Sequence, residues 1–186
     1  MADSTSDYQI VSGKTVFEGL LVQMRHDRIR LPDGREALRE VVIHGPGAAV
    51  LPVDTDGKLI FVRQYRHPIQ DMALEMPAGV CEKGEDPAVC AARELEEETG
   101  IQADKITFLF RFYSSIGFCT EELFLYLAEG IHQGEQRLDE DEFVTLETYT
   151  PQEAFDMIRR GEIVDAKTIA AVLYYIHEHL DLPASL

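Results

Sequence analysis

Residues 75–101 of this chain read EMPAGVCEKGEDPAVCAARELEEETGI, and this stretch decides the fold. Three of its residues mark the two ends of a helix. Asp86 suits an N-cap, Pro87 suits the first turn, and Gly100 suits the position just after the last turn. The stretch therefore predicts a helix over residues 86–99, preceded by a loop that turns tightly at its glycines.

The predicted helix carries three glutamates on one face. Glu94, Glu97 and Glu98 have the i, i+3 and i+4 spacing that places side chains next to one another. Three carboxylates so close together repel one another at neutral pH unless cations or free access to water relieve them. Hard oxygen ligands select Mg²⁺ or Mn²⁺, and Mg²⁺ typically bridges protein carboxylates and substrate phosphates. Geometry alone leaves two interpretations, a metal site for phosphate chemistry or a solvated glutamate-rich helix face.

The rest of the chain alternates strand-like segments with turns. Asp-Gly pairs favour one tight hairpin at 31–34 and a second that joins 48–54 to 58–66. Thr150-Pro151-Gln152-Glu153 is a capping box that begins a helix. Many strands with few helices indicate a mixed sheet flanked by helices. The predicted strands are residues 14–25, 38–44, 48–54, 58–66, 106–112, 122–128 and 143–149, and the predicted C-terminal helices are residues 150–160 and 166–180.

Composition and charge exclude several classes of protein. The 186 residues are 45% hydrophobic and 27% charged, which supports a core and excludes whole-chain disorder. The net charge is −17, and because acids and bases balance in residues 1–70, the whole excess lies in residues 71–186. A nucleic-acid binder needs the opposite sign, and no run approaches the ~20 apolar residues of a membrane helix. With no visible signal peptide and no CxxC pair, the expected location is cytoplasmic.

The spacing of the fixed residues decides between the two interpretations. Gly79, five residues, Glu85, seven residues, Arg93-Glu94-Leu95, one residue, Glu97-Glu98, one residue and Gly100-Ile101 fill every fixed position of the Nudix box. The sequence therefore resembles the Nudix hydrolases. Residues 75–79, 63–66 and 39–42 resemble the branch of ADP-ribose pyrophosphatases and related nucleoside-diphosphate-sugar hydrolases. The resemblance spans about residues 14–180.

This resemblance implies an α/β fold, a Nudix-type α/β/α sandwich with a mixed β-sheet plus an N-terminal antiparallel strand subdomain. It divides the chain into a flexible tail (1–7), a β subdomain for dimerisation and substrate contacts (8–45) and a catalytic domain (46–186) with its Nudix box at 79–101. The implied reaction is Mg²⁺-dependent hydrolysis of the diphosphate of a nucleoside diphosphate sugar, best ADP-ribose to AMP and ribose 5-phosphate. Mn²⁺ is a possible substitute. The expected partners are the nucleotide sugar and a second copy in a homodimer, with no nucleic acid and no membrane.

Family analogy also assigns the metal ligands. Glu94 and Glu98 are the implied ligands, and Glu97 shares a metal or its bound water. The Ala78 carbonyl is a further ligand, and Glu142 reaches a metal from a loop after the box.

The same analogy assigns the catalytic residues. Arg93 orients the carboxylates and Glu85 pairs with it, unless the two form an ordinary surface ion pair. Glu140 is the candidate general base, unless it is simply part of an acidic loop tip. Glu121 or Glu122 is the competing base.

The predicted substrate contacts lie outside the box. Arginines are expected to clamp the pyrophosphate or the terminal ribose. Phe17 is expected to stack an adenine, unless it is a core aromatic, and Glu40 to hydrogen-bond a base edge. The predicted substrate-binding set is Arg66, Arg39, Arg63, Phe17, Glu40 and Glu121.

One position departs from this branch. ADP-ribose hydrolases usually carry a proline some fifteen residues beyond the box, where this chain has Ile116. The departure leaves open a broad or GDP-mannose-type nucleoside-diphosphate-sugar hydrolase. The alternative from another class is a non-catalytic Nudix sensor of nucleotide sugars, although such proteins tend to lose box glutamates that this chain keeps.

Overall fold

The computed structural model describes residues 7–138 and 143–179, which fall into two compact units. One unit runs to Pro46 and includes Tyr113–Glu122. The other holds Gly47–Phe112 and the described residues from Leu123 onward. Among the described residues, no helix is both long enough and apolar enough to cross a membrane.

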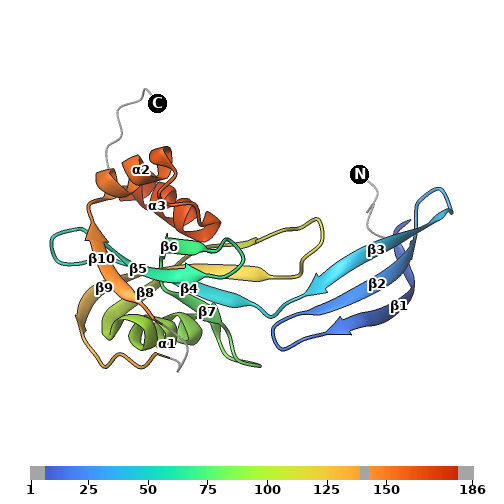
Figure 1. Ribbon diagram of the computed structural model, residues 1–186, viewed down its shortest axis with the longest axis horizontal. Helices are drawn as coiled ribbons and strands as arrows, with labels where there is room; N and C mark the ends of the chain where they lie inside the picture. Colours follow the sequence, from blue (N-terminus) through green and yellow to red (C-terminus); the bar gives the residue numbers. More distant parts are fainter. Residues whose placement is uncertain (1–6, 139–142, 180–186) are drawn as a thin grey trace. The chain divides into compact units, whose positions relative to one another are not determined.

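A three-stranded antiparallel sheet makes up most of the first unit (Figure 1). Its strands are β1 (Gln9–Glu18), β2 (Gln23–Arg30) and β3 (Glu36–Ile43), in the order β1-β2-β3. The expected turn at 31–34 joins β2 to β3, and Gly34 adopts a φ of 84° there, a conformation that glycine takes without strain.

The prediction of one strand over residues 14–25 is wrong. Glu18 pairs with Gln23, so the chain reverses between β1 and β2. The N–H of Gly19 donates to the carbonyl of Val22 at 2.9 Å across this bend. Apolar residues continue through the bend, and a reading of periodicity therefore did not detect it.

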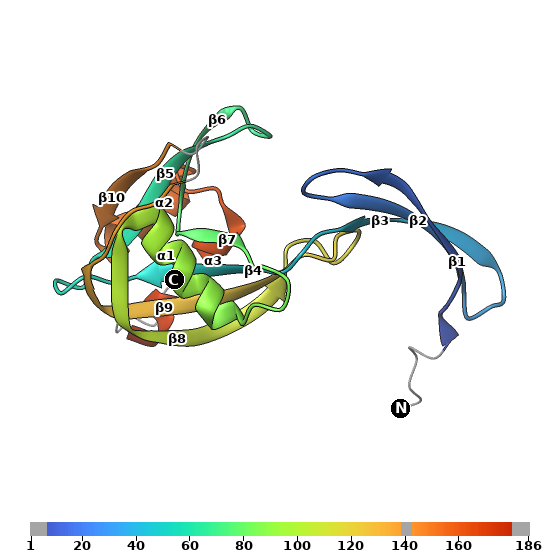
Figure 2. The same ribbon diagram turned by 90° about the horizontal axis from the view of Figure 1, so that it is seen from below.

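The second unit places its sheets between helices. Figures 1 and 2 show α1 on one side of the sheets and α2 and α3 on the other. One sheet has the order β7-β4-β9-β8 and is mixed, because β4 runs parallel to β9 and antiparallel to β7; the other has the order β10-β5-β6. This is the α/β/α arrangement that the sequence predicts. Its elements are β4 (Gly47–Pro52), β5 (Leu59–Arg66), β6 (Asp71–Glu75), β7 (Ala78–Val80), α1 (Pro87–Thr99), β8 (Ile101–Tyr113), β9 (Glu122–Gln133), β10 (Thr145–Tyr149), α2 (Pro151–Arg160) and α3 (Ala166–His179).

Strand β4 explains why this unit has three layers. Every residue of β4 is buried, and its side chains alternate between two faces as strand geometry requires. Ala49 and Leu51 pack in a core with residues of β5, α2 and α3, whereas Ala48 and Val50 pack in a core with residues of α1. A strand that is apolar on both faces needs cover on both sides.

The predicted hairpin of 48–54 with 58–66 is correct in its turn and wrong in its pairing. The N–H of Asp54 donates to the Lys58 carbonyl at 2.9 Å, which closes the turn. However, β4 and β5 belong to different sheets, and a single isolated bridge joins Val53 to Leu59. Pairing of β4 with β9, and of β5 with β10, takes the place of the local hairpin.

Candidate active site

Helix α1 begins and ends where its sequence predicts. Asp86 is the N-cap, and its carboxylate accepts a hydrogen bond from the N–H of Ala88 at 2.8 Å. Gly100 closes the helix with a φ of 67°, and its N–H donates to the Glu96 carbonyl at 2.8 Å. Between these caps the inner face packs against β4. The helix is therefore fixed at both ends and along one face, which sets the positions of its glutamates.

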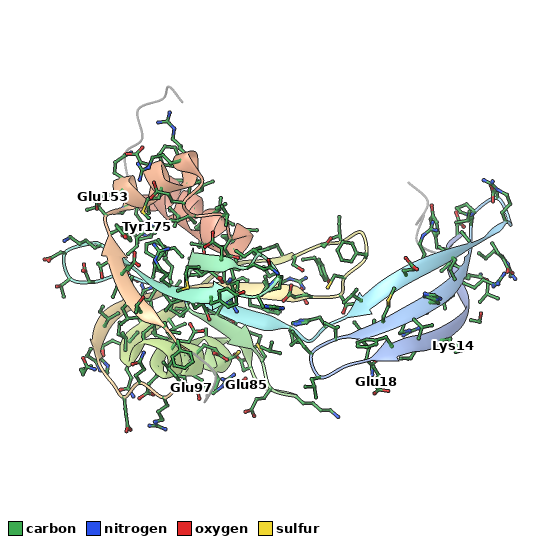
Figure 3. The ribbon with its side chains drawn as sticks, in the orientation of Figure 1. Lys14, Glu18, Glu85, Glu97, Glu153 and Tyr175 are labelled. Atoms are coloured by element: carbon green, nitrogen blue, oxygen red, sulfur yellow. The ribbon has the colours of Figure 1, made fainter. Side chains whose placement is uncertain are left out.

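A single guanidinium connects three carboxylates of this segment. Nε and Nη2 of Arg93 donate to the two oxygens of Glu85, each at 3.0 Å. Nη1 donates to Glu94 at 2.7 Å and to Glu97 at 2.8 Å. Hydrogen bonds from Arg93 and from the backbone of Glu82 lower the pKa of Glu85 to about 2, and Glu85 in turn raises the pKa of Arg93. Figure 3 shows Glu85 and Glu97 near each other beside α1.

Strand β7 lies next to Glu98 and Glu94 of the helix. The N–H of Ala78 donates to Oε2 of Glu98 at 3.2 Å, and Glu98 is only 3% exposed. A Cβ added to Gly79 would stand 2.1 Å from the carboxylate of Glu94, so a side chain at this position would displace that carboxylate. The structure thus brings together Ala78, Glu94 and Glu98 through one short strand and one helix face.

A second group of charges, which we call the Glu75 cluster, lies on β5, β6 and the start of α3. It consists of Arg66, Glu75, Asp165 and Lys167. Arg66 donates through Nε and Nη2 to the two oxygens of Glu75, at 2.7 and 3.0 Å. Nζ of Lys167 contacts the same carboxylate and lies 3.0 Å from Oδ2 of Asp165. The cluster joins strands near the box to a helix about ninety residues further along the chain.

Electrostatics keep this cluster charged. Burial raises the pKa of Glu75, but Arg66 and Lys167 lower it by more, so the net pKa lies below its usual range. Glu75 raises the pKa of Arg66, and Glu98 adds to that rise, so Arg66 lies within electrostatic reach of the box. Sequence reasoning assigned no role to Glu75, Asp165 or Lys167. An Asp three residues before the Thr of a predicted helix is typical of an N-cap. The Asp165-x-x-Thr168 spacing could therefore have indicated that Asp165 and the neighbouring Lys167 lie at the start of a helix.

The sequence and fold of this chain are similar to those of known proteins. The family described as "NUDIX domain" matches residues 43–172, more than half of the chain. The chain belongs to the Nudix family. It is 42% identical to the methanol dehydrogenase activator of Bacillus methanolicus and 40% identical to the ADP-ribose pyrophosphatase of Bacillus subtilis (strain 168), each over 166 residues that cover 88% of this chain and 90% of the relative. A crystal structure described as "ADP compounds hydrolase" shares the fold, with a TM-score of 0.84 at 19% identity over 94% of this chain and 97% of that chain.

Membership of the Nudix family makes this chain a hydrolase, and Nudix hydrolases generally use divalent metal ions. The donor set fits such an ion. Glu94, Glu97 and Glu98 supply hard carboxylate oxygens from adjacent turns, and the backbone of Ala78 lies beside Glu98. Arg93 pairs with Glu85, Glu94 and Glu97, and Arg66 lies within electrostatic reach of Glu98. Because these two guanidinium groups carry fewer charges than the four carboxylates, a divalent cation would relieve the remaining repulsion.

Arg63, another predicted substrate residue of this Nudix chain, is engaged elsewhere. Its guanidinium donates to both oxygens of Glu147 on the neighbouring strand β10, and Tyr149 donates to the same carboxylate at 2.5 Å. Because these bonds use Nε and Nη2, contact between Arg63 and a substrate would have to use the N–H groups that they leave over.

Four predicted substrate residues belong to the first unit of the Nudix chain rather than to the box. Phe17 is 56% exposed, so it is not the core aromatic of the alternative interpretation. Arg39 donates to a neighbouring carbonyl at 2.9 Å, Glu40 lies 3.5 Å from His26, and Glu121 lies 3.5 Å from His44. Two further predictions, Glu140 and Glu142, lie outside the described residues, and Glu122 is the first residue of β9.

Proposed function

We propose that this Nudix hydrolase cleaves the diphosphate of a nucleoside diphosphate sugar with Mg²⁺, and that ADP-ribose, hydrolysed to AMP and ribose 5-phosphate, is its preferred substrate. One observation carries the proposal. Arg93 holds Glu94 and Glu97 on the face of α1 that also presents Glu98 to the backbone of β7. Such a convergence of carboxylates suits a hard cation, and Mg²⁺ in proteins is typically shared with substrate phosphates.

The charges of the site also suit a diphosphate. Mg²⁺, when bound, offsets the negative charge of the phosphates and lowers the pKa of the attacking water. Glu94, Glu97, Glu98 and the Ala78 carbonyl would hold the ion. Arg66 commits Nε and Nη2 to Glu75, and its half-exposed guanidinium would present its remaining N–H groups to the diphosphate.

The proton of the attacking water needs an acceptor. We assign this role to Glu140, and Glu142 would reach a metal from the same loop. Glu121 and Glu122 are the competing bases. Arg93 and Glu85 do not touch the proton; they hold the metal-binding glutamates in position.

The first unit would bind the nucleoside and a second copy of the chain. We assign Arg39 to the terminal ribose, Glu40 to a base edge and Phe17 to stacking on the base. This unit exposes several large apolar side chains, among them Ile10 and Phe17 on β1 and Leu20 and Leu21 in the bend that follows it. Exposed apolar area of this kind supports a homodimer in which residues 8–45 contact the partner, with residues 46–186 as the catalytic domain.

The ADP-ribose pyrophosphatase of Bacillus subtilis, 40% identical to this chain, supports ADP-ribose as the substrate. Ile116 favours the alternative, a broad or GDP-mannose-type hydrolase, because it is exposed in the loop where ADP-ribose hydrolases usually carry a proline. The third possibility, a non-catalytic sensor of nucleotide sugars, fits poorly with a complete set of box glutamates.

A product-resolved hydrolysis panel tests the proposal. It holds ADP-ribose, ADP-glucose, GDP-mannose and UDP-glucose, each with Mg²⁺ and each with EDTA, and includes Glu98→Gln as the inactive control. We expect preferred, metal-dependent release of AMP and ribose 5-phosphate. Comparable rates on several nucleotide sugars would instead identify a broad hydrolase. No turnover on any of them would refute the substrate class and leave the sensor.

A further inference from the structure

Three possible metal ligands of a different chemical type meet at the other end of the Nudix box. They are the thiols of Cys81 and Cys90 and the carboxylate of Glu85, whose ligand atoms all lie within 4.8 Å of one another. Cys90 is 0% exposed and Cys81 is 6% exposed. We propose that Cys81, Glu85 and Cys90 form a second metal site, which selects Zn²⁺ over Mg²⁺ and which inhibits hydrolysis when it is occupied.

The ligand types decide the metal. Thiolate sulfurs suit Zn²⁺ and other soft ions, whereas Mg²⁺ demands hard oxygen ligands. Two sulfurs bound to one tetrahedral Zn²⁺ at about 2.3 Å lie about 3.8 Å apart, which falls inside the spread of this cluster. Three protein ligands leave a fourth position for water. Burial raises the pKa of both thiols, so they are protonated in the free protein and two protons leave when the metal binds.

The local fold prepares this cluster without any metal. Cys81 follows β7, and Cys90 lies in the first turns of α1, where both pack against Ala48 and Val50 of β4. Glu85 is held in the connecting loop, where it accepts a hydrogen bond from the N–H of Glu82 at 2.8 Å. Because all three ligands are fixed by core packing or by the loop, little ordering entropy opposes metal binding.

The inhibitory effect follows from Glu85, and this part rests on the proposed function. Glu85 holds Arg93 through two hydrogen bonds, and Arg93 in turn holds Glu94 and Glu97. A Zn²⁺ ion that binds Glu85 takes its carboxylate away from Arg93. Nη2 of Arg93 also lies 3.6 Å from Sγ of Cys90, so the ion would sit directly beside the guanidinium and repel it. The glutamates that bind Mg²⁺ would lose the residue that orients them.

Cobalt binding tests the site independently of activity. The full chain is reduced, stripped of metal and titrated with Co²⁺, which gives a thiolate-to-cobalt charge-transfer band when cysteines bind it, and Zn²⁺ is then used to displace the Co²⁺. We expect one equivalent, with affinity lowered by about 100-fold in Cys81→Ser and in Cys90→Ser. Cys119→Ser is the matched control, because this third cysteine belongs to the other unit, and it should bind like the parent. Cys81→Ala, checked by circular dichroism, replaces any serine variant that fails to fold.

Hydrolysis at fixed Mg²⁺ and rising Zn²⁺ tests the inhibition. We expect the parent and Cys119→Ser to be inhibited at the Zn²⁺ concentration that fills the site, and Cys81→Ser to need about 100-fold more. A charge-transfer band that is absent from the parent, or that forms in Cys81→Ser with the parent's affinity, would overturn the site, as would formation of a disulfide between Cys81 and Cys90 in place of metal binding. Equal inhibition of the parent and Cys81→Ser would overturn the inhibitory role. If the parent hydrolyses no nucleotide sugar, the proposed function fails, and cobalt binding still decides the site.

Discussion

Substitution of Lys167 by Met would remove one charge from the buried pair that Lys167 forms with Glu75. The side chains of Glu75 and Lys167 are 4% and 11% exposed. Methionine keeps the length and the apolar stem of lysine. Glu75 would keep its hydrogen bonds to Arg66, whereas Asp165 would lose the ammonium group that lies 3.0 Å from its Oδ2 atom. A test of this one side chain therefore asks whether the Glu75 cluster stabilises the fold.

The expected cost follows from burial. Breaking a buried ion pair by removing one partner costs about 3–5 kcal/mol, because the other charge stays in a poorly solvated place. Arg66 still donates two hydrogen bonds to Glu75, which lowers the expected cost to about 2–3 kcal/mol. For a chain of this length, this corresponds to a fall in the melting temperature of about 4–12 °C.

The assay is chemical and thermal unfolding followed by far-UV circular dichroism, because the chain has no tryptophan to report by fluorescence. The matched control is Lys105→Met, which breaks a pair with Glu129 at 2.7 Å whose side chains are 66% and 43% exposed. Such exposed pairs contribute well under about 1 kcal/mol. Glu75→Gln should lower the free energy of unfolding by about 1–2 kcal/mol less in the Lys167→Met variant than in the parent. Equal effects of Lys167→Met and the control, or strict additivity of the double variant, would refute the reasoning.

Three more predictions concern the box. Glu98→Gln should lower hydrolysis by about 100-fold or more with an unchanged melting temperature, because the amide oxygen can still accept from Ala78; an active variant would remove Glu98 from the metal site. Gly79→Ala puts a Cβ 2.1 Å from the Glu94 carboxylate and should lower activity by displacing that carboxylate, with a loss of stability of about 1 kcal/mol. Gly117→Ala, with nothing within 4 Å of its Cβ, should keep the parent's melting temperature. The pKa of Glu85 is lowered to about 2 in the folded protein, so its ion pair stabilises the fold above pH 4.5 and is lost as pH falls toward about 2. The difference in urea midpoint between the parent and Glu85→Gln should therefore shrink as the pH falls from 4.5 to about 2. A difference that stays constant would show that the ion pair of Glu85 does not stabilise the fold.

The sequence predicted the parts of this structure whose causes are local. Asp86 and Gly100 cap α1 with atoms from neighbouring residues, and the helical repeat alone places Glu94 beside Glu97 and Glu98. Pairing of distant strands was harder to predict, because nothing in the turn at Asp54 reveals that β4 will pair with β9 rather than β5. Glu140 and Glu142 lie outside the described residues, so their roles remain predictions.

The same distinction separates the two charged groups of the site. Arg93 and its carboxylates lie within one short segment, so a spacing pattern could reveal them. Glu75 and Lys167 are 92 positions apart in the sequence and meet only when α3 packs on β6. No periodicity connects them, and Glu75 alone reads as one more acid in an acidic half of the chain. Only the burial of both partners shows that they act as a pair.

The rigidity of α1 is what makes its carboxylates suitable for a cation. Repulsion between neighbouring glutamates is usually relieved by small movements of side chain or backbone. Here the helix is capped at both ends, its inner face is packed against β4, and Glu94 is pressed against the backbone of Gly79. Glu98 is buried and already accepts from the backbone of β7. Movement of Glu94 and Glu98 is therefore restricted, and a bound cation would lower the repulsion that Arg93 leaves, so the contacts that stabilise the fold also favour metal binding.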